Sequence, residues 1–202
     1  MIVCFEGPSA VGKSSLSKLL SDQHLIVPEV NLLFEGETPN SKFWYYKKQI
    51  ERYQICLKTN QSSILDGDPF QPLWYNWIYD FPKQFPNFEE TVTFYAKQIS
   101  LEQLRFPDLY IIFETDLDNL YQRKESDKSR KRRNFEKHLK LIEPQKKYFK
   151  FLQEETTVEV KFVDLMNLKT AREEVLALIE ATKKQEQNPS DVFEKIKNWI
   201  IL

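Results

Sequence analysis

Glycine is scarce in this sequence, with four residues in 202, whereas average usage in soluble proteins is near 7%. Cysteine is scarcer still, since Cys4 and Cys56 are the only two and no CxxC pair is present. The chain also has only two histidines. So few cysteines and histidines exclude both a disulfide framework and a standard zinc site. We therefore expect both thiols to be reduced core residues.

Long hydrophobic runs and an excess of charge of one sign are also missing. Apolar runs such as Leu109–Phe113 reach about five residues, far below the roughly 18 needed to cross a bilayer. Residues 1–5 lack a basic segment and resemble a first strand more than a signal peptide. A formal net charge of −1 excludes a uniformly basic coat for a nucleic acid polymer. We expect a cytoplasmic protein without a membrane or nucleic acid partner.

Short apolar runs alternate with segments of helical periodicity, which is typical of an α/β protein with a parallel sheet. The pattern predicts one domain over residues 1–202 with a doubly wound, five-stranded parallel sheet. Strands are expected over Ile2–Glu6, Leu25–Val27, Ser63–Asp66, Leu109–Glu114 and Val158–Asp164. Helices are expected over Ser14–His24, Phe43–Thr59, Phe88–Leu104, Asp116–Lys124, Asn134–Gln153 and Lys169–Lys183.

Two further segments have no place in that alternation. A proline-rich, aromatic stretch over residues 68–88 is predicted to be a long irregular loop. A last helix over about 189–201 carries an apolar stripe formed by Phe193, Ile196, Trp199 and Ile200. Docking of this stripe on its own domain is the simpler interpretation, and a homodimer or partner contact is the alternative.

The motif GxxxxGK[ST] lies between the first expected strand and the helix after it, which is the context that makes it specific. Its backbone N–H groups can surround phosphate oxygens, Lys13 adds a charge near the β- and γ-phosphates, and Ser14 offers a hydroxyl to Mg²⁺. Ser15 is either an α-phosphate contact or a solvated serine. The nucleotide-binding residues are thus predicted to be Gly7, Pro8, Ser9, Ala10, Val11, Gly12, Lys13, Ser14 and Ser15.

The loop predicts binding of a nucleoside triphosphate. Other motifs indicate which class of nucleotide-binding protein this is. An NKxD motif that would read guanine is absent from the sequence, and so is an apolar strand ending in Asp-Glu. A switch GTPase and an ATPase motor are therefore disfavoured, which leaves a kinase.

Several segments resemble the deoxynucleoside kinase and thymidylate kinase group of P-loop phosphotransferases, in matching order over about 160 residues. They are Phe5-Glu6-Gly7, Val27-Pro28-Glu29-Val30, Pro107-Asp108-Leu109 and the arginine-bearing segment from Arg123. The resemblance implies a kinase fold with a helical lid at about 123–134, and ATP and Mg²⁺ as cofactors.

The resemblance also implies roles for individual residues. Glu29 falls where these kinases carry the base that accepts the hydroxyl proton, and Asp66 falls where an acidic residue binds Mg²⁺ through water. Gly67 stands in place of the arginine that should follow, and Asp68 after it is an alternative base. An alignment anchored on Arg52 puts Tyr45 where deoxynucleoside kinases commonly carry a glutamine that binds the base of the nucleoside.

The arginine distribution supports a phosphate clamp independently of the resemblance. The chain has seven arginines, and Arg123, Arg130, Arg132 and Arg133 lie within eleven residues. Guanidinium groups bind phosphate oxygens in a bidentate manner. A solvated helix face is the alternative interpretation of this basic segment.

Aromatic residues gather on both sides of Asp66 in the sequence, among them Tyr45, Tyr46 and Trp74. They could stack on a planar acceptor or pack in the core. Together the observations predict an ATP- and Mg²⁺-dependent transfer of phosphate to a small molecule, most simply a nucleoside or nucleotide. A kinase of antibiotic-type compounds and a non-catalytic nucleotide-binding regulator are the alternatives.

The lid generates the first testable prediction. If an arginine closes on the transferring phosphate, at least one of Arg130→Lys, Arg132→Lys and Arg133→Lys should lower kcat strongly, because a point charge does not reproduce a bidentate fork. Steady-state kinetics of the three variants test this. Unchanged kinetics in all three would favour the solvated face.

Overall fold

The computed structural model describes residues 1–79, 85–127, 135–183 and 186–201. A five-stranded parallel sheet forms its centre, with strand order β2-β3-β1-β4-β5. The strands are β1 Ile2–Glu6, β2 Leu25–Val27, β3 Ser63–Asp66, β4 Leu109–Glu114 and β5 Val160–Asp164. The predicted α/β class and all five predicted strands are confirmed, with β5 two residues shorter at its start.

Helices follow most of the strands. They are α1 Lys13–Lys18, α2 Val30–Leu33, α3 Trp44–Leu57, α4 Gln71–Ile78, α5 Phe88–Ser100, α6 Leu117–Ser126, α7 Phe135–Leu139, α8 Ile142–Glu155, α9 Leu168–Ala181 and α10 Pro189–Ile201. The helix expected from Ser14 to His24 ends early, at Lys18, and α2 was not expected. The helix expected over residues 134–153 is two helices, α7 and α8.

Residues 68–88 are not irregular throughout, because α4 lies within them. The prediction of one long loop is therefore wrong over Gln71–Ile78. Pro72 lies in the first turn of α4, where a missing N–H costs no helical hydrogen bond. Leu73 and Trp74 are fully buried on the inner side of this helix. Proline thus marks the start of a packed helix here.

Side chains that cap the helices fix several of the boundaries. Asn87 accepts a hydrogen bond from the Glu90 N–H, and the Glu90 carboxylate accepts one from the Asn87 N–H, which is a complete capping box for α5. Asp116 and Asn167 accept bonds from the first-turn N–H groups of α6 and α9 in the same manner.

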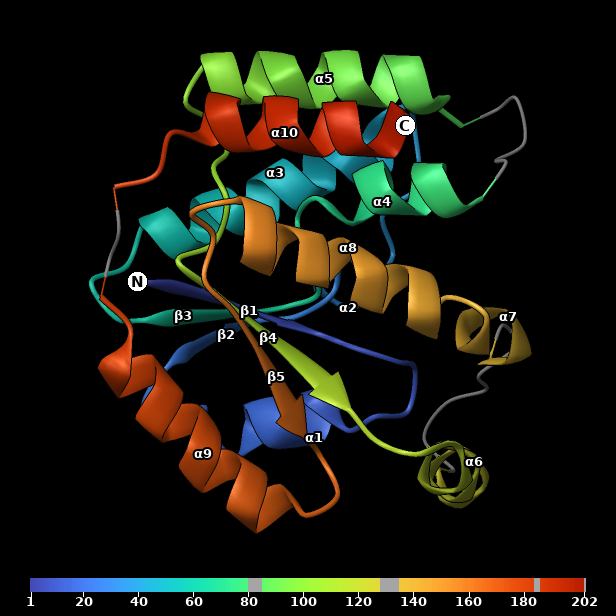
Figure 1. The fold of residues 1–202 in the computed structure, drawn as a ribbon, viewed down its shortest axis with the longest axis vertical. Helices are drawn as coiled ribbons and strands as arrows, with labels where there is room; N and C mark the ends of the chain where they lie inside the picture. Colours follow the sequence, from blue (N-terminus) through green and yellow to red (C-terminus); the bar gives the residue numbers. More distant parts are fainter. Residues whose placement is uncertain (80–84, 128–134, 184–185, 202) are drawn as a thin grey trace.

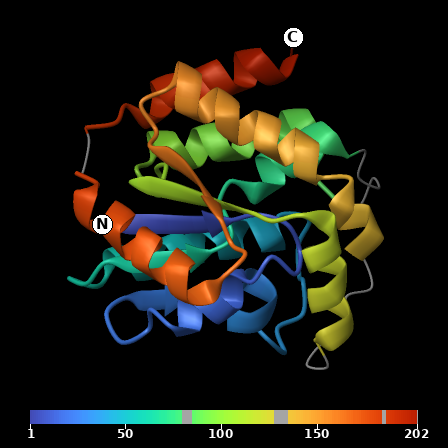
Figure 2. The same cartoon turned by 60° about the horizontal axis from the view of Figure 1, so that its bottom comes forward.

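Helices cover both faces of the sheet. In Figures 1 and 2, α3, α4, α5, α8 and α10 lie on one side, and α1 and α9 lie side by side on the other. β1 shows how the sheet serves two cores, since Ile2 and Cys4 join the first cluster and Val3 and Phe5 join the second. The strand is apolar and fully buried up to Phe5 because both of its faces are covered.

The apolar stripe of α10 docks on the rest of the chain. Phe193 and Ile196 are buried, and α10 runs along α5 (Figure 1). Trp199 stacks on Phe151 of α8 with ring centroids 4.6 Å apart and also contacts Trp77 of α4. The structure therefore agrees with the simpler interpretation of the stripe.

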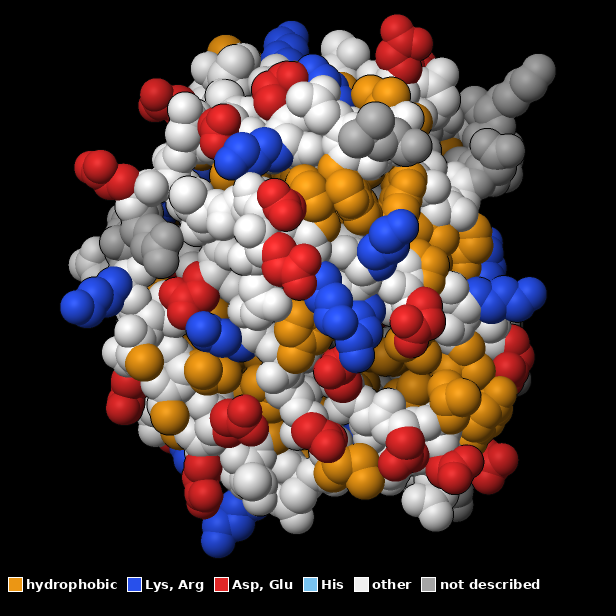
Figure 3. Space-filling model, viewed as in Figure 1, with side chains coloured by type: hydrophobic (Ala, Val, Ile, Leu, Met, Phe, Trp, Pro, Cys, Tyr) orange, Lys and Arg blue, Asp and Glu red, His pale blue; other side chains and the backbone are white. Residues whose placement is uncertain are grey.

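The surface agrees with a near-neutral net charge. Acidic and basic side chains intermingle over the face seen in Figure 3, with hydrophobic side chains between them. Within the residues that the structure describes, no helix is long and apolar enough to span a membrane.

Asp68 is a polar centre within the larger core cluster. Its carboxylate accepts hydrogen bonds from the Phe70 N–H, the Trp74 indole and the Tyr110 hydroxyl, at 2.8 to 3.0 Å. Burial raises the pKa of Asp68 to about 7, and the negative charge of Glu6 acts in the same direction, against the three donors. Asp68 thus links β3, α4 and β4 inside the protein.

Tyr110→Phe tests this link through its pH dependence. The bond from Tyr110 favours charged Asp68, so its loss should lower the free energy of unfolding by roughly 1–3 kcal/mol near pH 8.5. The loss should be smaller near pH 5, because the folded-state carboxyl, whose pKa is raised to about 7, is largely protonated there and gains less from this donor.

Tyr148→Phe is the matched control, because the Tyr148 hydroxyl is also buried in this cluster but has no hydrogen-bond partner among the described residues. It should be neutral or stabilising at both pH values. Urea unfolding at the two pH values measures both variants, and equal, pH-independent losses would contradict the role of Asp68.

Candidate active site

The strand order places the candidate residues at one edge of the sheet. β3 lies between β2 and β1, and Phe5 pairs with Asp66. The carboxyl ends of parallel strands face the same edge. Glu29 after β2, Asp66 at the end of β3 and the loop after β1 therefore meet there, although they are far apart in sequence. A pocket of about 1440 Å³ opens at this edge.

The predicted phosphate loop lines this pocket along its whole length, from Gly7 to Ser15. A side chain at Gly7 would come within 2.5 Å of the Phe113 carbonyl oxygen, and its φ of +138° also favours glycine. Gly12 has a φ of +112° just before α1. Lys13 donates a hydrogen bond from Nζ to the Gly7 carbonyl at 2.9 Å, which folds its side chain back over the loop.

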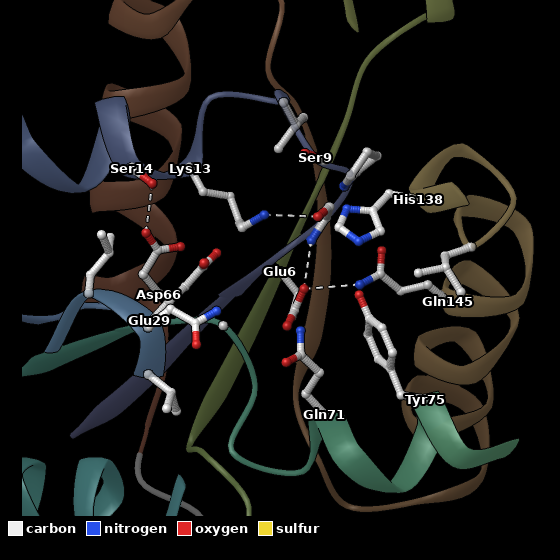
Figure 4. A pocket seen from close by; sticks show the side chains of 18 of the residues that line it. Glu6, Ser9, Lys13, Ser14, Glu29, Asp66, Gln71, Tyr75, His138 and Gln145 are labelled. Carbon is white, nitrogen blue, oxygen red and sulfur yellow. Dashed lines mark hydrogen bonds between the residues drawn. The ribbon is translucent and has the colours of Figure 1, made fainter. Parts of the chain in front are cut away.

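Ser14 and Asp66 form the contact expected of a magnesium site. The Ser14 hydroxyl donates to Asp66 Oδ2 at 2.8 Å (Figure 4). Asp66 is 3% exposed, and its other carboxylate oxygen, Oδ1, is buried without a hydrogen-bond partner among the described residues. A buried carboxylate oxygen left free beside a hydroxyl suits a hard divalent cation. These two residues therefore fit Mg²⁺, with phosphate and water as its remaining ligands.

Glu29 is available for chemistry in the same pocket. It precedes α2, where its backbone carbonyl accepts bonds from Leu32 and Leu33. Its half-buried carboxylate lines the pocket and makes no hydrogen bond or ion pair with a described residue. Figure 4 shows Glu29 beside Asp66 and below Lys13. The backbone of Glu29 is thus fixed while its carboxylate stays free.

Asp68 does not join Glu29, and its prediction as an alternative base is not supported. Its side chain is fully buried, lies outside the lining of the pocket and is held by three donors. A bend at Gly67, where φ is +100°, turns the chain after β3, so that Asp68 lies among Phe70, Trp74 and Tyr110 and not beside Asp66.

Arg123 lines the pocket, but it binds protein carbonyls. Its Nη1 donates to the Val11 carbonyl and its Nη2 donates to Leu165 and Met166, at 2.6 and 3.2 Å for the latter two. It thereby ties the phosphate loop to the turn after β5. The other predicted arginines, Arg130, Arg132 and Arg133, and most of the predicted lid lie outside the described residues.

The residues predicted to bind the phosphate acceptor all line the pocket, but the protein holds their polar groups to different extents. Arg52 is 1% exposed and donates to the carbonyls of Pro28 and Asp66 at 2.7 and 2.8 Å, which binds the ends of β2 and β3 together. Tyr46 and Trp74 are buried, and their polar atoms are bonded to Thr91 and Asp68. Tyr45 is half-buried, and burial raises its pKa.

Glu6 is a site residue that the sequence reasoning did not single out. Its buried carboxylate accepts bonds from the N–H groups of Gly7 and Asp68 and from the Gln145 amide of α8, at 2.8 to 3.1 Å. Burial raises the pKa of Glu6, against the lowering effects of Lys13 and these backbone donors. A charge at the end of the otherwise apolar strand IVCFE was the available signal. Gln71 and Tyr75 were also missed, because α4 was not predicted.

Comparisons with known proteins support the fold alone. No protein-family model and no curated protein matches the sequence. Among solved structures, deoxyadenosine kinase from M. mycoides with bound dATP has a TM-score of 0.65 at 16% identity, over 90% of this chain and 100% of that one. Thymidylate kinase from Candida albicans has a TM-score of 0.59 at 17% identity, over 89% and 90%. The chain therefore has the α/β fold of nucleoside and nucleotide kinases, as its sequence motifs indicated.

Lys13 and Arg123 border the same loop, and their replacement should have different consequences. Lys13→Ala should weaken binding of a nucleoside triphosphate strongly, because it removes the cation aimed at the phosphates, and should leave the apo melting temperature within a few degrees. Arg123→Met should lower the melting temperature by several degrees, because hydrogen bonds from a charged group contribute about 1.5–3 kcal/mol and each kcal/mol corresponds to roughly 2–4 °C at this size.

Calorimetric titration and thermal unfolding measure these effects. Arg172→Met is the control for Arg123, because Arg172 makes one exposed bond to the Leu19 carbonyl. Wild-type nucleotide affinity in Lys13→Ala would contradict the phosphate-loop assignment. An Arg123→Met protein as stable as the control would contradict the proposed tie between the two loops.

Proposed function

We propose that this protein is an ATP- and Mg²⁺-dependent kinase that transfers the γ-phosphate to a hydroxyl of a small molecule of the nucleoside or nucleotide class. One observation carries the proposal: the Ser14–Asp66 pair, with the free Oδ1 of Asp66, faces the unpaired carboxylate of Glu29 in a pocket that the phosphate loop also lines. A metal site, a phosphate cradle and a base in one cavity are what phosphoryl transfer requires.

The reaction assigns a task to each group. The acceptor hydroxyl oxygen forms a bond to the γ-phosphorus, and the bond from that phosphorus to the bridging oxygen breaks, which releases ADP. Glu29 takes the hydroxyl proton. The loop N–H groups and Lys13 bind the phosphate oxygens, for which Lys13 leaves the Gly7 carbonyl. When bound at Ser14 and Asp66, Mg²⁺ supplies positive charge to the phosphates.

The acceptor side of the pocket supports a flat, partly apolar molecule. Tyr45 of α3 and Tyr75 of α4 are half-buried aromatic residues in the pocket lining, and buried Trp74 lies behind Tyr75 with ring centroids 4.6 Å apart. Amide groups of Gln49 and Gln71 lie among the rings. Aromatic walls with a few polar groups are typical of sites for heterocyclic ligands.

Acceptor-dependent release of ADP tests the proposal. A panel of nucleosides, nucleoside monophosphates and aminocyclic or aromatic antibiotics should give turnover with a nucleoside or nucleotide. Turnover with antibiotics alone would favour an antibiotic-type kinase. Binding of ATP without transfer to any acceptor would favour a nucleotide-binding regulator.

Substitutions of Asp66 and of Glu29 should have different effects on the kinetics. Asp66→Asn should raise the Mg²⁺ concentration for half-maximal rate by roughly tenfold or more, because the metal site loses charge. Glu29→Gln should leave that concentration unchanged, lower kcat by about 10²-fold and abolish the acidic limb of the pH–rate profile.

Glu35→Gln is the control, because Glu35 is an exposed carboxylate near Glu29 in the chain that lies outside the pocket lining. Its kinetics should match those of the unchanged protein. Retention of both rate and pH profile in Glu29→Gln would remove Glu29 as the base, whatever the behaviour of Asp66→Asn.

A further inference from the structure

A line of polar side chains crosses the acceptor pocket from α3 to α4. Arg52 Nη1 donates a hydrogen bond to Gln49 Oε1. Gln49 and Tyr45 of α3 both line the pocket. Tyr45 donates to Gln71 Oε1 at 2.8 Å. Two hydrogen bonds, Arg52 to Gln49 and Tyr45 to Gln71, thus lie in the lining of this pocket.

Each of these two bonds has a defined donor and acceptor. A guanidinium has donors only and stays charged in proteins, and Arg52 is itself held by the Pro28 and Asp66 carbonyls. Gln49 therefore presents its carbonyl oxygen to Arg52. The Tyr45 hydroxyl in turn donates to Gln71, which presents its carbonyl oxygen.

The consequence is an oriented amide in the pocket. Because the Gln71 carbonyl is engaged by Tyr45, the group left to face a ligand is its NH₂, which donates to no described residue. Figure 4 shows Gln71 projecting from α4 towards Glu6, on the opposite side of the pocket from Lys13 and Ser14. Glu6 accepts bonds from Gly7, Asp68 and Gln145, and no hydrogen bond joins it to Gln71. The Gln71 NH₂ is thus a donor without an acceptor among the described residues.

We infer that Gln71 determines acceptor specificity by donating to an exocyclic carbonyl oxygen of a planar heterocycle, so that carbonyl-bearing nucleosides are preferred over their amino counterparts. This inference rests on the proposed function. A nucleoside whose hydroxyl faces Lys13 and Ser14 reaches Gln71 with the end of its base remote from the sugar, where the exocyclic group lies. An amino group there would place donor against donor and leave both unpaired.

Pairs of nucleosides that differ at this group test the inference. Binding and kcat/KM are measured for deoxyuridine against deoxycytidine and for deoxyinosine against deoxyadenosine. The unchanged protein should favour the carbonyl member of each pair by roughly 10- to 100-fold. Equal values, or a preference for the amino members, would overturn the inference.

Variants separate the Gln71 amide from the Tyr45 hydroxyl that orients it. Gln71→Glu should reverse the preference, because a carboxylate accepts from an amino group and repels a carbonyl. Tyr45→Phe should bring the ratio towards one, because Gln71 can then turn its amide. Gln98→Glu on α5, outside this pocket, should keep the ratio of the unchanged protein. A ratio unaltered in both Gln71→Glu and Tyr45→Phe would overturn the inference.

Separate controls distinguish a loss of folding from a loss of function. If Gln71→Glu unfolds by circular dichroism, Gln71→Leu replaces it and should abolish the preference. Carbonyl-selective binding without ADP release would contradict the proposed kinase activity and leave the role of Gln71 intact. ADP release with equal use of both members would contradict Gln71 alone. Binding of none of the four nucleosides would overturn the inference.

Discussion

The buried carboxylate of Glu6 is the contact on which the site depends. It lies at the end of the central strand and accepts bonds from the start of the phosphate loop, from the chain after β3 and from α8. A charge in such a position is stable only when donors surround it, because desolvation opposes ionisation. These donors and the charge of Lys13 supply that compensation. The same bonds hold three segments in one arrangement at the sheet edge.

Other buried polar residues perform similar structural work beside the pocket. Arg52 joins the ends of β2 and β3, Arg123 joins the phosphate loop to the turn after β5, and Asp68 joins β3 to α4 and β4. Each of these was a candidate for direct chemistry by residue type. A residue whose donors or acceptors are all engaged by the protein positions its neighbours, and Glu29 differs because its carboxylate is free.

The pocket thus combines a rigid frame with a few uncommitted groups. Sheet order, loop and buried bonds fix the backbone around Ser14 and Asp66. Among the described residues, Oδ1 of Asp66, the Glu29 carboxylate and the Gln71 NH₂ have no protein hydrogen-bond partner. They lie along one cavity and differ in chemistry, as a metal ligand, a proton acceptor and a hydrogen-bond donor. Ligands that satisfy all three must supply a cation for Asp66, a hydroxyl for Glu29 and an acceptor atom for Gln71.

The amino-acid sequence determined the strands and the phosphate loop, because both depend on local patterns. Buried parallel strands are short apolar runs, and the loop is a contiguous motif whose two glycines meet local backbone demands. Only the tertiary structure decided which polar residues are free. α4 was hidden by Pro72, which the sequence reasoning took as a sign of a loop. The engagement of Arg52, Asp68 and Arg123 depends on carbonyls and hydroxyls from distant segments, and such long-range pairing leaves no periodic trace in one sequence.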